Sequence, residues 1–504
     1  MTHSKLMGRR NFIKGMAAAS AAVATPALAL SEPAKGIKWD KQVDIAIIGS
    51  GFAGLAAAIE AKRLGGNNIE IFEKMAVYGG NSAINGGLFA APNTPLQAKE
   101  GRKDSPDTMV ADQLKAGRGI ADEKILRHVA EHAMEALQMT LDAGAEYHPY
   151  LQQLGGHSVP RTYQTTVSCG GGITQPLLKE CKKLGVTLSN RTKFEGFLLD
   201  EQGGVEGIKV RRGYYFGKED GGNLEHIKVG KGVIVATGGF AQNINLRMAQ
   251  DPTLTSEVGC TNAKGATGEA MLEMFRVGAV PVHMAHIQSG PWASPDEGGF
   301  GYVSNYSIYN FPHSIAVDRR TGLRFMDEIA DRKTRADAQL ERRDEQGNPN
   351  PPLMITSYKQ SKQHPTAKKV LKYGVGWKFD SVEALAEHFG VPLAPLKQQI
   401  EEYNGYVKTG VDKQFGKNMA KAKGKYLEAP FTVVRLWPKV HYCQGGVQIN
   451  PRAEVLNSMT GKPISKLFAA GEVTGGTHGV SRLGSCSIPE CMVMGMTAAR
   501  TILA

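Results

Sequence analysis

The chain has 504 residues, 41% hydrophobic and 21% charged, so it can bury a large core and form about two domains. Its net charge of +12 fits an anionic substrate or an acidic partner, but no dense basic run with interleaved aromatic residues indicates nucleic-acid binding. The six cysteines include no Cys-x-x-Cys pair, which argues against a zinc ribbon and an attached c-type haem, and we expect no metal site.

The first 29 residues resemble a twin-arginine export signal. Residues 8–14 (GRRNFIK) carry the paired arginines, residues 16–24 are Ala-rich and mildly apolar, and residues 27–29 (ALA) suit cleavage. The alternative, a membrane anchor, is disfavoured because the apolar run is short. We therefore expect a folded, cofactor-loaded protein exported to the periplasm, without stable membrane insertion.

A dinucleotide-binding pattern follows at residues 43–58. An apolar run ends in Gly49-x-Gly51-x-x-Gly54 and leads directly into an Ala-rich helix. Gly49 suits the tight turn, Gly51 a close approach to a pyrophosphate, and Gly54 close packing of helix on strand. Glu73 ends the next predicted strand, where a carboxylate would bind ribose hydroxyls. The alternative is a glycine turn that binds nothing.

The chain then alternates between glycine-rich loops and regular elements. Residues 79–87 (GGNSAINGG) form a backbone-rich loop that suits the N5–O4 edge of a flavin, the alternative being a surface loop. Helices are predicted at 107–117, 123–143 and 174–185, and short strands at 187–236. The last strand ends in the turn Ala236-Thr237-Gly238.

These motifs occur in a characteristic order, ending with Gly471-Glu472 and a final helix from Ile488. Together they resemble the FAD domain of the fumarate reductase/succinate dehydrogenase flavoprotein superfamily. The chain is most similar to the soluble periplasmic flavocytochrome c fumarate reductases and their relatives that reduce other enoates. The resemblance spans about residues 40–504 but lacks the haem domain, which implies a separate c-type cytochrome as electron donor.

The resemblance implies an α/β fold in which a Rossmann-like, glutathione-reductase-like FAD domain carries an inserted α+β capping domain. The expected division is FAD domain at 40–240 and 356–504 and cap at 241–355, with a helical pair at 381–418 returning to the FAD domain. FAD is expected to be non-covalent. Its expected contacts are Gly49, Gly51, Ala53, Gly54, Glu73, Lys74, Gly80, Asn81, Ser82, Asn85, Gly86, Gly87, Ala236, Thr237, Gly238, Gly471, Glu472, Arg482, Ser487 and Ile488.

Two arginines match family motifs. Arg324, in Gly-x-Arg-Phe-x-Asp-Glu, is expected to protonate the substrate carbon, and Arg482 to bind the substrate carboxylate. Arginine suits a carboxylate because its planar fork donates two parallel hydrogen bonds. A free guanidinium is a very poor acid, so the first role requires a proton relay. The alternative for Arg324 is a structural ion pair with Asp327 or Glu328.

Three further residues are expected in the site by resemblance. His441 and Tyr442 align with a Val-His-His segment, Tyr442 replacing the second histidine, and His286 lies near a family His-Pro-Thr motif. The alternative for His286 is a hydrogen-bonded histidine of the cap.

One departure concerns the substrate. Counting back from Asp318 places Tyr306, Ser307 and Asn310 where fumarate reductases carry Thr-Glu-x-x-Arg. That change removes a carboxylate contact and the usual relay, so fumarate is not the expected substrate. Nearby aromatics suit a larger or less polar enoate, or else form cap core: Trp292, Tyr302, Tyr306, Tyr309 and Phe311. Another relay could use Asp327, Asp331, Arg332 or Arg335.

The expected function is therefore FAD-dependent reduction of the C=C bond of an α,β-unsaturated carboxylate in anaerobic respiration. The alternative is an FAD-dependent dehydrogenase that desaturates a ketosteroid or a carboxylic acid, with Tyr442 or Tyr306 as its base.

Overall fold

The fold is taken from a computed structural model, which describes residues 32–504. The predicted export signal lies outside these residues. None of the helices between residues 32 and 504 combines the length and apolar character that crossing a bilayer needs.

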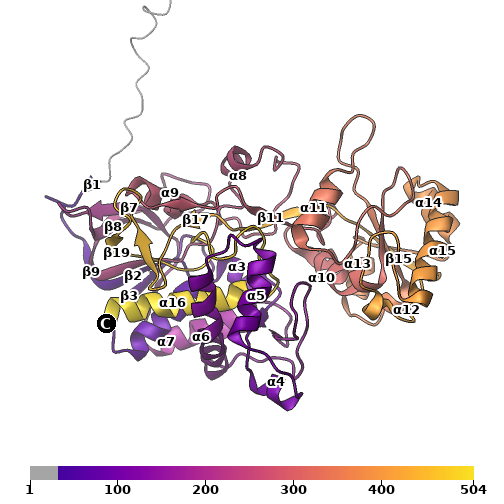
Figure 1. Cartoon of the computed structure of the whole chain (residues 1–504). Coiled ribbons are helices and arrows are strands. Elements are labelled where there is room, and N and C mark those ends of the chain that lie inside the picture. The colour runs from indigo at the N-terminus through magenta and orange to yellow at the C-terminus, as the bar shows by residue number, and fades with distance from the viewer. Residues whose placement is uncertain (1–31) are drawn as a thin grey trace, which may run out of the picture.

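A nine-stranded sheet forms the centre of the larger domain (Figure 1). Its strand order is β1-β7-β8-β9-β2-β3-β6, and β19 joins β9 in parallel and carries β18. The strands are β1 (Glu32–Pro33), β2 (Lys41–Ile48), β3 (Ile69–Phe72), β6 (Thr187–Ser189), β7 (Thr192–Leu199), β8 (Val205–Arg212), β9 (Asn223–Val235), β18 (Glu454–Leu456) and β19 (Pro463–Ala469). The C-terminal halves of the parallel strands β2 and β9 and all of β3 are buried, which fits the apolar residues that end β2 and β9.

The helices of this domain are α2 (Phe52–Arg63), α3 (Gly80–Ile84), α4 (Pro95–Lys99), α5 (Pro106–Ala116), α6 (Glu123–Asp142), α7 (Gly171–Lys183), α8 (Ile244–Gln250), α9 (Glu269–Arg276) and α16 (Ser487–Leu503). Five of them, α2, α5, α6, α7 and α16, lie where the sequence predicts them, whereas α3, α4, α8 and α9 were not predicted. The Ala-rich α2 is buried between the sheet and α16. A Cβ at Gly495 would lie 2.2 Å from the Ala53 carbonyl oxygen, so this glycine lets α16 touch α2.

The smaller domain is built on a second, four-stranded sheet of order β12-β13-β15-β14 (Figure 1). Its strands are β12 (Ile315–Val317), β13 (Leu353–Ser357), β14 (Trp377–Phe379) and β15 (Phe431–Arg435). Its helices are α10 (Gly301–Asn310), η1 (Phe311–His313), α11 (Arg332–Leu340), α12 (Tyr358–Ser361), α13 (Thr366–Lys372), α14 (Val382–Phe389), α15 (Leu393–Thr409) and η2 (Met419–Ala422).

This arrangement corrects the predicted cap boundaries. The helical pair at 381–418 does not return to the FAD domain, because Leu385, Leu396 and Tyr403 share one buried cluster with Ile315 of β12. Conversely, residues 241–286 do not belong to the cap: Met271 and Met274 of α9 pack into the core of the larger domain. The cap therefore runs from about residue 291 to 436.

Two strands side by side connect the domains. The chain leaves the larger domain along β11 (Ile287–Gly290) and returns along β16 (Lys439–Cys443), its antiparallel partner. Short pairs complete the larger domain: β4 (Leu88–Ala90) with β5 (Thr162–Gln164), and β10 (Pro281–Val282) with β17 (Gly446–Val447). The domain boundary thus lies directly at the segments that carry Gln288 and His441.

Candidate active site

The glycine turn after β2 has the close contacts that its sequence predicts. Gly49 has φ +104°, and a Cβ there would lie 2.4 Å from the Ala236 carbonyl oxygen. A Cβ at Gly54 would lie 2.1 Å from the Gly49 oxygen. The turn therefore accepts only glycine at both positions. It also places the N-terminus of α2 against a cavity, so that the free N–H groups and the positive end of the helix dipole point toward that cavity.

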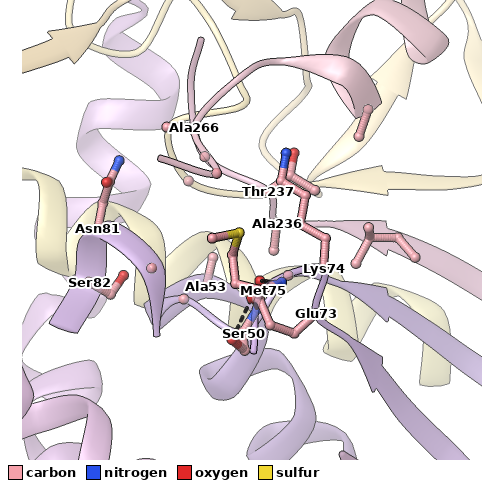
Figure 2. A pocket seen from close by; sticks show the side chains of 18 of the residues that line it. Ser50, Ala53, Glu73, Lys74, Met75, Asn81, Ser82, Ala236, Thr237 and Ala266 are labelled. Carbon is pink, nitrogen blue, oxygen red and sulfur yellow. Dashed lines mark hydrogen bonds between the residues drawn. The ribbon is translucent and has the colours of Figure 1, made fainter. Parts of the chain in front are cut away.

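Glu73 stands beside this turn. One of its carboxylate oxygens accepts hydrogen bonds from the N–H and hydroxyl of Ser50, at 3.2 and 2.6 Å. The other accepts from the Met75 N–H at 2.9 Å. Figure 2 shows Ser50 next to Glu73, with Asn81 and Ser82 to their left in the view. These bonds hold the carboxylate at the end of β3.

The nucleotide cavity encloses about 990 Å³ of empty space, open solvent included. Thirteen predicted contacts line it: Gly49, Gly51, Ala53, Glu73, Lys74, Gly80, Asn81, Ser82, Ala236, Thr237, Gly238, Gly471 and Glu472. Further lining residues were not predicted, because they come without a local motif from the segment after β3, from β7, from the start of α9 and the segment before it, and from α16. They include Met75, Thr192, Lys193, Phe194, Ala263, Ala266, Glu269 and Cys491.

Seven predicted contacts do not line this cavity: Gly54, Asn85, Gly86, Gly87, Arg482, Ser487 and Ile488. Gly54 instead packs α2 on the turn. Asn85 holds the end of α3, where its amide donates to the Ser82 carbonyl oxygen and its side-chain oxygen accepts from the Gly87 N–H. Ser487 and Ile488 begin α16, and Ile488 is core.

The cavity fits FAD. Its wall offers glycine backbone, a helix N-terminus and a fixed carboxylate, and the buried hydroxyl of Thr237 has no hydrogen-bond partner among the residues that the structure describes. Glu472, at the inner end, accepts a hydrogen bond from the Cys443 N–H at 2.9 Å. Burial raises the pKa of Glu472 to about 7.

Arg324 does not reach this region, which corrects its predicted role. Its guanidinium is buried in the cap, where it donates to Glu328 and to Asp412, each at 2.9 Å. Lys417 Nζ completes the network 3.0 Å from Glu328. The two carboxylates raise the pKa of Arg324 against the effect of burial. The structural alternative, an ion pair with Glu328, is the arrangement observed.

Two other arginines meet at the domain boundary. Arg332 begins α11 of the cap, and Arg482 lies in the loop before α16. Arg482 donates to the Leu483 carbonyl oxygen at 2.9 Å, and its Nε is buried without a partner. Arg332 donates to the Gln288 side-chain oxygen at 3.3 Å. In the described chain neither guanidinium has an ion pair with a carboxylate. Burial and the nearby charge of Arg482 lower the pKa of Arg332 far below its ordinary value.

Gln288 links the two arginines and was not predicted from the sequence. Besides accepting from Arg332, its amide donates to the Ser481 hydroxyl at 2.9 Å and to the Arg482 carbonyl oxygen at 3.3 Å. A lone glutamine in a strand carries no local signal of such a role. The hydrogen bonds of Gln288 thus connect the cap to the FAD domain.

His441 and Tyr442 line the same place. His441 Nδ1 is 2.7 Å from the Thr261 hydroxyl, and burial with the charges of Arg332 and Arg482 keeps its pKa far below the usual range. The Arg482 guanidinium lies 4.5 Å from the centre of the Tyr442 ring. Burial raises the pKa of Tyr442 well above its ordinary value. Both side chains are therefore neutral neighbours of the cationic pair.

The other predicted residues lie elsewhere. His286 is half-buried beside His283, with ring centres 5.5 Å apart, and has no hydrogen bond to either free arginine. Tyr306 and Ser307 are fully buried in the cap. Asn310 donates to the Tyr306 carbonyl oxygen and contacts His313. This corrects Tyr306 as a candidate base, since its ring belongs to the cap core.

Comparison with known proteins defines the class. Residues 44–488 match the model of the FAD binding domain family, and the chain belongs to that family. It is an FAD-dependent oxidoreductase with a Rossmann-like domain, as its sequence predicts.

The relatives are reductases. The chain is 77% identical over 504 residues to the acrylate reductase flavoprotein subunit of Shewanella woodyi, covering 100% of each chain. It is 32% identical to the urocanate reductase of Eggerthella lenta, over 93% of this chain and 76% of that protein. The solved open conformation of a flavocytochrome c3 fumarate reductase superposes with a TM-score of 0.76 at 27% identity, covering 100% of this chain and 82% of that one. The predicted fumarate reductase-like resemblance is confirmed.

Proposed function

We propose that this protein reduces the C=C bond of a small α,β-unsaturated monocarboxylate, with acrylate as the substrate. The observation that carries the proposal is the pair Arg332 and Arg482, two guanidinium groups that lie near each other at the domain boundary and have no carboxylate partner within residues 32–504. Buried charges are normally paired, so this site is built for an anion that the substrate supplies. The acrylate reductase subunit of Shewanella woodyi, 77% identical, supports the choice.

The two arginines have different roles in the proposed reaction. Arg482 binds the substrate carboxylate through its planar fork, next to the Tyr442 ring. FAD, when bound in the cavity, supplies a hydride to the β-carbon. Arg332 donates a proton to the α-carbon, which completes addition across the double bond and gives the saturated acid. This replaces Arg324 as the proton donor.

Arg332 suits this role because its environment disfavours its charge. It is the first residue of α11, where the helix dipole is positive, and the charges of Arg482 and Arg335 lie nearby. Arg335, one turn further along α11, has a pKa lowered to about 10, and Asp327 nearby has a raised pKa. We place the proton relay along these two residues.

The electrons come from a separate c-type cytochrome in the periplasm. Support for this comes from the twin-arginine-like residues 8–14 and from the name of the Shewanella woodyi relative, which is a flavoprotein subunit. A subunit of that kind needs another protein to deliver electrons.

Anaerobic oxidation of reduced methyl viologen by the holoprotein tests the reaction. The panel contains acrylate, methacrylate, crotonate, fumarate and urocanate, with propionate plus an oxidised dye as the reverse reaction. We expect rapid dye oxidation with acrylate and little with fumarate. Dye reduction by a saturated acid, without any enoate reduction, would establish the dehydrogenase instead.

A further inference from the structure

The end of β11 places a tryptophan against the cationic pair. Trp292 is 2% exposed. Its ring meets the ring of His441 edge-on, with centres 4.8 Å apart, and the Arg332 guanidinium lies 6.0 Å from the indole centre. Trp292 therefore contacts two of the groups that surround the expected substrate.

Gly290 leaves the space that this indole occupies. A Cβ at Gly290 would lie 2.5 Å from the indole Cη2 and 2.7 Å from Cζ2 and Cζ3. Gly290 is not among the glycines with positive φ, so its backbone conformation does not demand glycine. The missing side chain instead leaves room for the indole to lie on the backbone of β11.

The indole, which we call the wall of the site, packs against a second aromatic ring. The Phe300 ring centre lies 4.9 Å from the indole centre, and both rings belong to one cluster of the cap. Because buried aromatic rings in such a cluster are close-packed, the indole cannot move away at low cost. It forms a rigid, uncharged face beside His441.

The other four aromatics that the sequence singled out do not form this wall. Tyr306 and Phe311 are buried in the cap core, while Tyr302 and Tyr309 are exposed. They do not widen the site for a larger enoate. Among the five, Trp292 alone contacts Arg332 and His441.

We propose that Trp292, seated on Gly290, determines substrate specificity by restricting the site to enoates with a very small β-substituent. The proposal rests on the function proposed above. A β-methyl group would collide with the indole, and a second carboxylate would meet an apolar face without a cationic partner. Trp292 is thus a specificity residue, distinct from the arginines that bind and protonate the substrate.

Trp292→Ala tests the proposal. The ratio of kcat/KM for crotonate to kcat/KM for acrylate should rise at least tenfold over the wild type, since one methylene or methyl group is worth about 10- to 200-fold in such a pocket. Trp377→Ala is the matched control, because this indole lies on β14 at the edge of the cap sheet, where it packs on His388 and Phe389. Its ratio should stay within twofold of wild type. An unchanged ratio in folded Trp292→Ala would overturn the proposal.

A binding measurement on the wild type avoids dependence on folding of the variant. Propionate and butyrate are titrated into the holoprotein while the absorbance of bound FAD is followed. Propionate should bind at least tenfold more tightly than butyrate, and Trp292→Phe should narrow that difference. Equal affinities in the wild type would overturn the proposal. If no enoate of the panel is reduced, the proposed function itself fails, independently of the Trp292 result.

Discussion

At the scale of single residues, two arginines eight positions apart have opposite electrostatic environments. Arg324 is neutralised by Glu328 and Asp412 inside the cap. Arg332 faces Arg482 and has no carboxylate partner in the described chain. A paired guanidinium holds its proton more strongly, whereas an unpaired one in a buried cationic environment releases it more easily. The site environment therefore supports the proposal that Arg332 is the acid.

Replacing Arg332 tests this assignment. Arg332→Ala should lower kcat for acrylate by about 10²- to 10⁴-fold, the usual contribution of a positioned acid, while FAD remains bound. In the wild type, kcat should fall as the pH rises through the lowered pKa of Arg332, because only the protonated guanidinium donates. Steady-state kinetics across pH, with FAD quantified by absorbance, measures both effects.

Arg324→Ala is the matched comparison. It leaves Glu328, Asp412 and Lys417 buried with an unbalanced charge, which should cost about 3–5 kcal/mol of stability. Thermal unfolding should show a large decrease in Tm, while folded protein retains substantial kcat. Loss of activity at unchanged Tm in Arg324→Ala, with an active Arg332→Ala, would return the acid role to Arg324.

At the scale of elements, the position of α2 depends on how closely α16 approaches it. The N-terminus of α2 faces the nucleotide cavity, and α16 packs along α2 through Gly495. The position of the cofactor-binding helix is therefore set by a residue near the C-terminus. A substitution that disturbs the packing of α16 on α2 should therefore also weaken the binding of FAD.

Gly495→Ala tests this packing. The added Cβ would lie 2.2 Å from the Ala53 carbonyl oxygen, so α16 must shift, at a cost of about 1–3 kcal/mol. We expect a lower Tm and weaker FAD retention. Gly405→Ala, at an exposed position of α15 with nothing within 4 Å of the new Cβ, should instead raise stability by about 0.4–1 kcal/mol. Equal effects in the two variants would show that the helix contact is unimportant.

At the scale of the whole molecule, the site exists only where the two domains meet. The FAD domain supplies Arg482 and the cap supplies Arg332, and Gln288 on the connecting strand bonds to both segments. Two strands, β11 and β16, carry the chain across. Catalysis should therefore depend on the relative position of the domains.

Gln288→Leu should disturb that position without unfolding either domain. It removes the hydrogen bonds to Arg332, Ser481 and Arg482, and we expect kcat/KM for acrylate to fall at least tenfold at nearly constant FAD content. Gln152→Leu is the control, since Gln152 pairs with Gln164 inside the FAD domain. Wild-type kinetics in Gln288→Leu would rule out this role.

Local sequence patterns were enough to predict the FAD-binding half of the protein. The turn at Gly49–Gly54, Glu73, α2 and the final helix are set by short-range sterics and helix periodicity, which local residues encode. For the same reason, most predicted contacts in those motifs line the cavity.

The arrangement of the substrate half, in contrast, followed from contacts between segments far apart in the chain. Asp412, which neutralises Arg324, lies 88 positions away in the chain, and His441 is brought to Trp292 by strand pairing. The amphipathic pattern of α15 shows that it buries one face, but not against which sheet. Charge pairing and domain membership depend on contacts between distant segments, and no local pattern specifies them.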